Sequence, residues 1–338
     1  MRSRWWSWND GAPMKALLCT QWGDPSALAL GEAASRAPGK GEVRLAVRAC
    51  GVNFADTLMI QGQYQVKPPF PFSPGLEVAG EVLAVGEGVS HLRPGDRALA
   101  VCGYGGMAEE VVTSAALALP LPPAMDFVTG AAFPVAYGTS HVALTRRAHL
   151  EPGETLLVLG AAGGVGLAAV ELGKRLGATV IAAAGAPEKL ALCQRYGADH
   201  TINYAVENLR DRVKSITGGR GVNVVFDPVG GDVFDEAFRT IAWEGRVLVI
   251  GFASGRIPQI PANLALLKNC AVIGVFWGAY SMNDPAVLGD SLRALLDAYA
   301  AGDLRPHVSQ TFPLARAADA FYALLSRQST GKIVVTID

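Results

Sequence analysis

Cysteine and charge are scarce in this sequence, and no long apolar run occurs. The 338 residues include only five cysteines, none in a Cys-x-x-Cys spacing: Cys19, Cys50, Cys102, Cys193 and Cys270. An odd, scattered set of cysteines argues against a disulfide framework and against structural zinc, and it favours a reducing compartment. Glycine, proline or charge interrupts every apolar segment before it reaches the length of a membrane span. We therefore expect free thiols, a cytoplasmic location and no membrane-spanning helix.

Excess charge of one sign is also missing. Lys and Arg number 29 against 30 Asp and Glu, a formal net charge of −1, and no basic run occurs. Neither nucleic acid nor an anionic membrane surface is therefore an implied partner. The 50% of hydrophobic residues and the length of the chain suit an α/β enzyme of two domains with a large core.

The N-terminus lacks the apolar stretch of a signal peptide. Residues 1–13 contain Trp5, Trp6 and Trp8 together with polar residues, and a regular strand pattern begins only at Met14. We predict residues 1–13 to be an N-terminal extension. Its role is open between a disordered segment and one that docks on a neighbouring subunit through its tryptophans.

The most informative stretch that is present runs from Thr155 to Gly166, TLLVLGAAGGVG. An uncharged apolar run predicts a buried parallel strand, a glycine turn follows, and residues 165–176 have helical periodicity with Glu171 assigned to the solvent side. Strand, glycine turn and helix in this order are typical of a dinucleotide site, where backbone N–H groups meet a pyrophosphate at the positive end of the helix. The glycine spacing matches the usual fingerprint only loosely, so a simple tight turn is the alternative. The predicted cofactor contacts of the turn are Gly160, Ala162, Gly163, Gly164, Val165 and Gly166.

The end of the next predicted strand, 178–184, lacks the acidic residue that holds the ribose 2′-hydroxyl in NAD sites. Gly185 stands there instead and leaves room for a 2′-phosphate. Lys189 can attract that phosphate, and Tyr204 can donate a hydrogen bond to it. We therefore predict NADPH rather than NADH as the cofactor. The alternative for Lys189 is an ordinary solvated residue of a helix.

Two patterns divide the chain. From Met14 to about residue 119, short alternating runs separated by turns predict a compact β domain that resembles a barrel. From about residue 131, strands and helices alternate, which predicts a doubly wound parallel sheet. The last segment differs again, and we expect it to return to the first domain. The strands of the sheet are predicted at 155–159, 179–184, 200–203, 223–227, 246–250 and 271–276, and the domains at 14–135 completed by 284–338, and 136–283.

Several short motifs occur together in this chain: 51–56 (GVNFAD), 74–80 (PGLEVAG), 94–97 (PGDR), 160–166 (GAAGGVG), 227–231 (DPVGG) and Gly331-Lys332. Through them, the chain from Met14 to Asp338 resembles the zinc-independent NADPH:quinone oxidoreductases, the zeta-crystallin-like family of the medium-chain dehydrogenase/reductase superfamily. The resemblance implies a GroES-like β-barrel catalytic domain, a Rossmann nucleotide-binding domain, an active-site cleft between them and a homodimer.

Zinc-dependent relatives bind the metal through a cysteine in G-x-C-x-x-D, a histidine in G-H-E and a further cysteine. This chain has Asn53 and Leu76 at the first two positions and no cysteine between Cys102 and Cys193. Cys50 lies close to the first position, and we interpret it as a buried strand cysteine. We predict no metal. Without a Lewis acid, hydride transfer to an electron-poor acceptor is favoured over alcohol oxidation.

The resemblance implies catalytic roles for Asn53, Asp56 and Tyr64. Asn53 can hydrogen-bond the acceptor oxygen or the nicotinamide ribose, and Tyr64 can donate a proton or a hydrogen bond. A buried structural role is the alternative for Asp56. A family tyrosine is replaced by Leu58, which predicts a more apolar pocket.

On the cofactor side, two of the residues that the resemblance adds have a structural alternative. Thr139 is equally consistent with a hydroxyl inside a helix that bonds a carbonyl, and Arg327 with an exposed residue at a helix end. The residues added are Thr139, Gly251, Phe252, Phe276, Trp277, Arg327 and Lys332.

Three functions remain open at this point. The preferred one is NADPH-dependent reduction of a quinone. The second is reduction of a carbon–carbon double bond in an enone or a 2-enoyl thioester, and the third is a non-catalytic NADPH-binding protein. The first two share hydride transfer to a small-molecule acceptor, so the motifs do not separate them.

Overall fold

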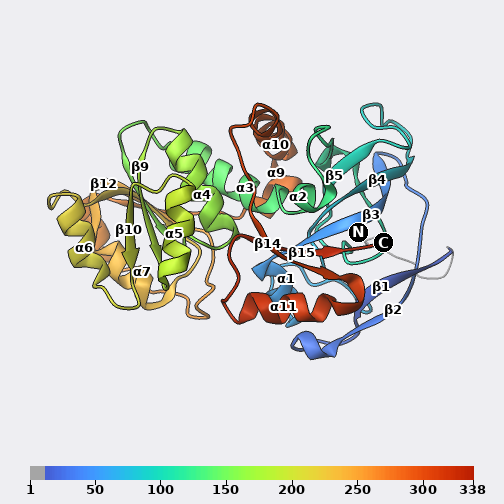
Figure 1. Cartoon of the computed structure of the whole chain (residues 1–338), viewed down its shortest axis with the longest axis horizontal. Helices are drawn as coiled ribbons and strands as arrows, with labels where there is room; N and C mark the ends of the chain where they lie inside the picture. Colours follow the sequence, from blue (N-terminus) through green and yellow to red (C-terminus); the bar gives the residue numbers. More distant parts are fainter. Residues whose placement is uncertain (1–11) are drawn as a thin grey trace. The chain divides into compact units, whose positions relative to one another are not determined.

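A computed structural model describes residues 12–338 of the chain (Figure 1). Apart from residues 12 and 13, the predicted extension with Trp5, Trp6 and Trp8 lies outside the described residues. The chain forms two compact units, one reaching to Val135 and resuming over Ser281–Asp338, the other comprising Ala136–Tyr280. The return to the first unit thus begins at Ser281, where the sequence predicted residue 284.

The first unit contains a seven-stranded, mostly antiparallel sheet and a two-stranded one. In the larger sheet the strand order is β14-β15-β3-β4-β5-β7, with β6 also paired to β3, and β1 pairs with β2 separately. The strands are β1 (Pro13–Cys19), β2 (Leu28–Ala34), β3 (Glu42–Val52), β4 (Glu77–Val85), β5 (Arg97–Val101), β6 (Glu110–Ser114), β7 (Ala118–Pro120), β14 (Val308–Pro313) and β15 (Lys332–Thr336). The α-helices are α1 (Phe54–Ile60), α2 (Phe127–Ala131), α10 (Pro285–Ala300) and α11 (Ala317–Leu325), and α9 (Tyr280–Asn283) begins at the border of the two units.

Strand β3 organises the core of this unit. Its alternating residues Val43, Leu45 and Val47 are buried, as the period of two predicts. Cys50 lies fully buried on the same strand, which confirms its structural interpretation, and all five cysteines of the chain are free thiols.

The C-terminal strand pairs with β3 and thereby joins the two ends of the unit. β15 runs antiparallel to β3, with Ile333 opposite Val52 and Val334 opposite Gly51. This register places Lys332, the first residue of β15, next to the end of β3 and the start of α1. Residues far apart in the sequence are brought together at that point.

The second unit is a doubly wound parallel sheet with the order β10-β9-β8-β11-β12-β13. The order reverses between β8 and β11, the place where such sheets bind nucleotides. Its strands are β8 (Thr155–Leu159), β9 (Thr179–Ala184), β10 (His200–Asn203), β11 (Val222–Asp227), β12 (Ile241–Val249) and β13 (Ala271–Gly274). Its helices are α3 (Pro134–His141), which begins at the border of the two units and which a π-helix continues over Val142–Arg147, α4 (Gly164–Arg175), α5 (Pro187–Arg195), α6 (Leu209–Ile216), α7 (Gly231–Phe238) and α8 (Ala262–Lys268).

Two expectations about this unit are wrong in detail. Glu171 does not face solvent: it is buried in α4 and accepts a hydrogen bond of 2.6 Å from the buried Tyr137 hydroxyl of α3. Periodicity along α4 alone could not show that α3 supplies a polar partner on that face. The last two strands also differ from prediction, because β12 begins at Ile241 rather than 246 and β13 ends at Gly274 rather than 276.

No helix within residues 12–338 is long and apolar enough to cross a membrane.

Candidate functional site

The glycine turn after β8 is shaped for close approach. Gly160 has a φ of +56°, and the Gly163 N–H donates to its carbonyl at 3.0 Å. Gly163 is the N-cap of α4 with extended backbone, and a Cβ atom on it would meet only the Gly160 oxygen at 3.4 Å. At Gly166 a Cβ atom would collide with that same oxygen. The first N–H groups of α4 have no intrahelical acceptor, so the turn offers donors and a positive helix end to an anion.

The loop after β11 lies beside this turn. A Cβ atom on Gly160 would come within 2.8 Å of Val229 Cγ2, so the loop after β11 packs against the glycine turn. Asp227 is fully buried, and its carboxylate accepts hydrogen bonds from the N–H groups of Val229 and Gly230 at 2.8 and 2.9 Å. Burial raises the pKa of Asp227 to about 6, an effect larger than the opposing hydrogen bonds.

The loop after β11 is tied to the loop that holds Gly251 and Phe252. The Gly251 N–H donates to the Asp227 carbonyl at 3.3 Å, and the Ala253 N–H donates to the Pro228 carbonyl at 3.0 Å. Sequence reasoning named Gly251 and Phe252 but missed Asp227 as the residue that shapes their surroundings. The available signal was an acid at the end of a buried strand, directly before Pro and Gly-Gly.

The residues predicted for a 2′-phosphate lie at the ends of β9 and β10. Gly185 is exposed, and a Cβ atom on it would lie 3.4 Å from the Tyr204 ring. The Tyr204 N–H donates to the Ala184 carbonyl at 3.2 Å, which joins the two strand ends. Lys189 lies in the first turn of α5, where Glu188 is exposed. The structure therefore brings Gly185 and Tyr204 together at the end of β9, where the chain has no acidic residue of its own, which fits a phosphate. At the neighbouring end of β10, Glu207 accepts a hydrogen bond from the Asn203 N–H at 2.7 Å.

Trp277 packs inside the second unit. A Cβ atom on Gly138 of α3 would lie 2.6 Å from the Trp277 ring, which is only 5% exposed. The neighbouring Thr139 is also buried, whereas Phe276 is exposed. The indole N–H of Trp277 has no hydrogen-bond partner among the described residues. The structure thus shows Trp277 covering α3 next to Thr139, a packing role, and its predicted contact with the cofactor stays a prediction.

Arg327 belongs to the first unit, whereas these loops belong to the second. It follows α11 in the first unit, is exposed and has a φ of +57°. Its predicted contact with a 2′-phosphate stays a prediction.

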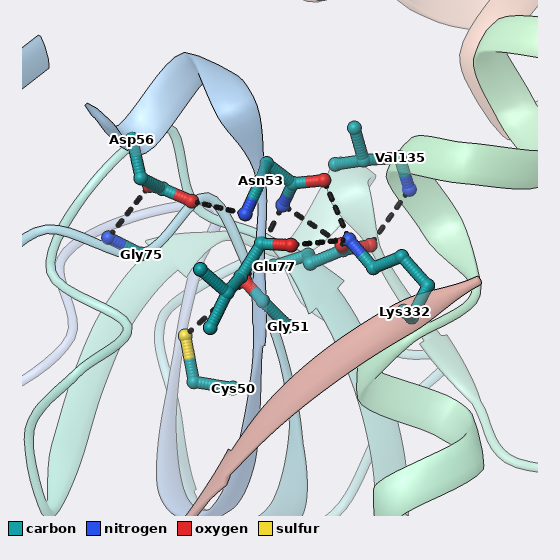
Figure 2. A network of polar contacts seen from close by, with 9 residues as sticks. Cys50, Gly51, Asn53, Asp56, Gly75, Glu77, Val135 and Lys332 are labelled. Atoms are coloured by element: carbon teal, nitrogen blue, oxygen red, sulfur yellow. Dashed lines mark hydrogen bonds and ion pairs between the residues drawn. The ribbon is translucent and has the colours of Figure 1, made fainter. Parts of the chain in front are cut away.

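In the first unit, Asn53, Glu77 and Lys332 form a buried group that we call the Lys332 cluster (Figure 2). Lys332 Nζ donates to Asn53 Oδ1 at 2.6 Å, to Glu77 Oε1 at 2.8 Å and to the Val52 carbonyl at 2.9 Å. Asn53 Nδ2 donates to Glu77 Oε1 at 2.9 Å. The Val135 N–H donates to the other Glu77 oxygen at 2.7 Å. Strands β3, β4 and β15 each contribute one part of this arrangement.

Asp56 supports the cluster from the side of α1. Its two carboxylate oxygens accept hydrogen bonds from the backbone N–H groups of Asn53 at 2.8 Å and Gly75 at 3.0 Å. The side chain is fully buried, and burial raises its pKa to about 7. Asp56 therefore holds the start of α1 against the loop before β4. Tyr64 packs on the same core, and burial, followed by the charge of Asp56, raises the pKa of its phenol.

Comparison with known proteins now gives the family. Residues 39–123 match the alcohol dehydrogenase GroES-like domain, and residues 164–290 match a domain described as zinc-binding dehydrogenase. The chain is 44% identical over 323 residues to the quinone oxidoreductase-like protein 2 homolog of Nematostella vectensis, an alignment that covers 95% of this chain and 88% of the relative. The chain belongs to the zinc-independent quinone oxidoreductase family of the medium-chain dehydrogenase/reductase superfamily.

Solved structures agree with this assignment. The quinone oxidoreductase of Escherichia coli, solved in complex with NADPH, superposes with a TM-score of 0.88 at 30% identity and covers 95% of this chain and 99% of its own. A mycobacterial protein, also solved with NADPH, gives a TM-score of 0.90 at 30% identity, with 96% and 100% covered. The predicted fold class, a GroES-like domain with a Rossmann domain, is confirmed.

The zinc named in one domain description does not fit this quinone oxidoreductase-type chain. Two of the ligand positions hold Asn53 and Leu76, and a leucine cannot bind a metal. The carboxylate beside them, Glu77, already pairs with the Lys332 ammonium at 2.8 Å. Across residues 12–338, no group of three or more His, Cys, Asp or Glu side chains is placed to hold a metal ion. The polar groups at this place form a buried ion pair between Glu77 and Lys332 and are not arranged as metal ligands.

The predicted contact of Lys332 with the cofactor stays a prediction. An ammonium has three N–H donors, and all three of Lys332 are used within the first unit. A direct hydrogen bond to the cofactor would therefore have to replace one of these. Sequence reasoning missed Glu77, the partner of Lys332, as a functional residue, although an acid at the start of a mostly apolar strand is a visible signal.

Proposed function

We propose that the chain is a zinc-independent NADPH:quinone oxidoreductase. The observation that carries the proposal is the Lys332 cluster, in which the Asn53 amide stands at a metal-ligand position of the zinc-dependent relatives and a buried ion pair lies beside it. Alcohol oxidation needs a Lewis acid to stabilise an alkoxide. A quinone spreads the incoming negative charge over its own conjugated system, and the protein then has mainly to align donor and acceptor. The names of the relatives support the same substrate class.

NADPH is the cofactor, and it supplies the hydride when bound. The N–H group of Gly164, at the start of α4, and the open space beside Gly163 suit its pyrophosphate. Gly185, Tyr204 and Lys189 suit its 2′-phosphate, because no carboxylate at the end of β9 repels that group. The loop of Gly251 and Phe252 and the buried Thr139 would border the nicotinamide end.

On the acceptor side, we assign the hydrogen bond to the quinone oxygen to Tyr64. Burial and the nearby Asp56 raise the pKa of the phenol, so Tyr64 remains protonated at neutral pH. A protonated phenol donates a hydrogen bond to an oxygen that gains charge during hydride transfer.

The test is NADPH oxidation by the purified protein with a simple para-quinone, measured beside a short 2-enoyl thioester. Turnover of the quinone alone supports the proposal. Preference for the thioester would instead identify an enoyl reductase. No NADPH oxidation with either acceptor, together with retained NADPH binding, would indicate a non-catalytic NADPH-binding protein.

We also propose a homodimer that forms at the β13 edge of the second unit. Among residues 12–338, β13 pairs only with β12, and the neighbouring α8 has no buried residue. Leu266 and Leu267 of α8 are 81% and 68% exposed, and Ile257 nearby in the sequence is also exposed. An open strand edge is self-complementary, because two copies can pair antiparallel about a two-fold axis.

The dimer is tested by the molar mass in solution. Light scattering is expected to give twice the chain mass for the unaltered protein and the monomer mass for Leu266→Glu/Leu267→Glu. A monomeric unaltered protein would refute the dimer and leave the proposed reaction untouched. The five free thiols favour a reducing, cytoplasmic location, which fractionation of the source cells would check.

A further inference from the structure

The amide of Asn53 has little hydrogen-bonding capacity left for a ligand. A carboxamide offers two N–H donors and two acceptor lone pairs. Both hydrogens of Nδ2 have acceptors within the unit, Glu77 Oε1 at 2.9 Å and the Gly51 carbonyl at 3.3 Å. One lone pair of Oδ1 accepts from Lys332 Nζ at 2.6 Å. Within residues 12–338, the Asp56 backbone N–H faces this side chain in a capping-box arrangement but makes no cap hydrogen bond with it, so the second lone pair is what the side chain can offer.

Lys332 and Glu77 determine the orientation of the Asn53 amide, that is, which of them its oxygen and its nitrogen face. The nitrogen and oxygen of a carboxamide have nearly the same shape, so their placement follows from their partners. An ammonium only donates and a carboxylate only accepts. Oδ1 must therefore face Lys332, and Nδ2 must face Glu77. A flipped amide would place N–H against the ammonium and oxygen against the carboxylate.

The two charged residues are themselves fixed. Glu77 is 0% exposed and Lys332 is 6% exposed, so each would be a buried unpaired charge without the other. The Val135 N–H holds the second Glu77 oxygen, and the Val52 carbonyl accepts the third Lys332 proton (Figure 2). The amide is thus held in one orientation before any ligand arrives.

We propose that Lys332 and Glu77 are positioning residues that make Asn53 a hydrogen-bond acceptor only. Asn53 then recognises a hydroxyl group of a bound ligand and does not donate to a carbonyl oxygen. The inference rests on the proposed function for its ligands: the hydroxyl belongs either to a ribose of NADPH or to the hydroquinone product. A quinone oxygen carries no hydrogen, so its hydrogen bond must come from a donor other than Asn53.

The decisive variant exchanges the amide and the carboxylate within the cluster. Asn53→Asp/Glu77→Gln keeps one amide, one carboxylate and one ammonium, and residue 53 keeps an acceptor oxygen but loses its N–H donors. Asn53→Leu removes donor and acceptor together and leaves the ion pair of Glu77 and Lys332 in place. If Asn53 acts only as an acceptor, the exchange variant retains about tenfold more of the affected function than Asn53→Leu, the worth of one hydrogen bond. Equal losses in two variants that melt at the same temperature would overturn the proposal.

The two sources of the hydroxyl are separated by binding and kinetics. NADPH affinity is measured by fluorescence titration without an acceptor, and kcat and KM are measured with the para-quinone. A weaker NADPH affinity in Asn53→Leu assigns the hydroxyl to the ribose. An unchanged NADPH affinity with a lower kcat assigns it to the hydroquinone. If Asn53→Leu changes none of these quantities, Asn53 recognises no ligand group and the proposal fails.

A spectroscopic measurement tests the orientation without any turnover. With ¹⁵N-asparagine labelling, the side-chain NH₂ signal missing from Asn53→Leu belongs to Asn53. We expect its protons to exchange slowly with solvent, and faster in Lys332→Met/Glu77→Gln, where the charges that orient the amide are gone. Solvent-like exchange in the unaltered protein would refute the orientation. A protein that reduces no quinone but shows slow exchange would refute the proposed function alone.

Discussion

The glycine turn of the second unit and the Lys332 cluster of the first unit are candidate binding sites built in opposite ways. The turn is built from backbone groups of one continuous stretch, residues 155–166, and its selectivity comes from the lack of side chains. The cluster is built from side chains whose positions differ by as much as 279 residues, and each is held by charge. A backbone site fails when an atom is added, whereas an ion-paired site fails when an atom is removed. The comparison therefore predicts different responses to mutation.

The largest effect is expected for removal of one charge from the cluster. Lys332→Met leaves the Glu77 carboxylate buried with its hydrogen bonds from Asn53 and Val135 but without a positive charge beside it, which should lower the free energy of unfolding by about 3–5 kcal/mol. Urea denaturation measures this loss. The control is Lys40→Met, because Lys40 pairs with Glu87 on the surface and both are largely exposed. A loss of unfolding free energy in Lys332→Met no larger than in that control would show that the buried pair does not stabilise the fold.

Next in size are two alanines placed in the turn. Gly166→Ala adds a Cβ atom that collides with the Gly160 carbonyl, so it should cost about 1–3 kcal/mol of stability as well as NADPH affinity. Gly163→Ala meets only an ordinary contact at 3.4 Å, so its stability should be unchanged while the added methyl group obstructs the pyrophosphate. Melting temperature and NADPH titration on both variants check this. Undiminished affinity in Gly163→Ala would contradict the assigned role of the turn.

The same contrast explains what could be predicted from the sequence. The strands 155–159, 179–184 and 200–203 have the predicted bounds, because period and glycine placement are local signals. The partners of Lys332 and Glu171 could not be found this way. Each partner lies on an element that is distant in the sequence, β4 for Lys332 and α3 for Glu171. Periodicity shows which face of an element is buried, but not which other element packs against that face.

A smaller effect is expected for the side chain that we assign to the 2′-phosphate. Lys189→Ala removes one positive charge from the first turn of α5 and should weaken NADPH binding about tenfold, with NADH binding almost unchanged. Titrations with both dinucleotides at low salt measure the ratio. Arg195→Ala, at the other end of the same helix, is the matched control and should leave the ratio unaltered. Equal weakening of both dinucleotides by Lys189→Ala would remove the lysine from the phosphate site.

The smallest effect concerns Asp227, the buried carboxylate in the loop after β11. Burial raises its pKa in the folded protein to about 6, above the ordinary value of 3.8, so the folded state binds the proton more tightly than the unfolded state. The stabilising contribution of that proton is present below pH 4 and is lost as the pH rises to about 6. Asp227→Asn does not titrate, so across this window its melting temperature should fall by a few degrees less than that of the unaltered protein. Parallel curves for the two proteins would mean that the loop hydrogen bonds from Val229 and Gly230 outweigh burial, and that the carboxylate stays ionised throughout. In that case the loops around the glycine turn would also depend on a charged side chain and not on backbone groups alone. The glycine turn and the Lys332 cluster would then differ only in how much each depends on charge.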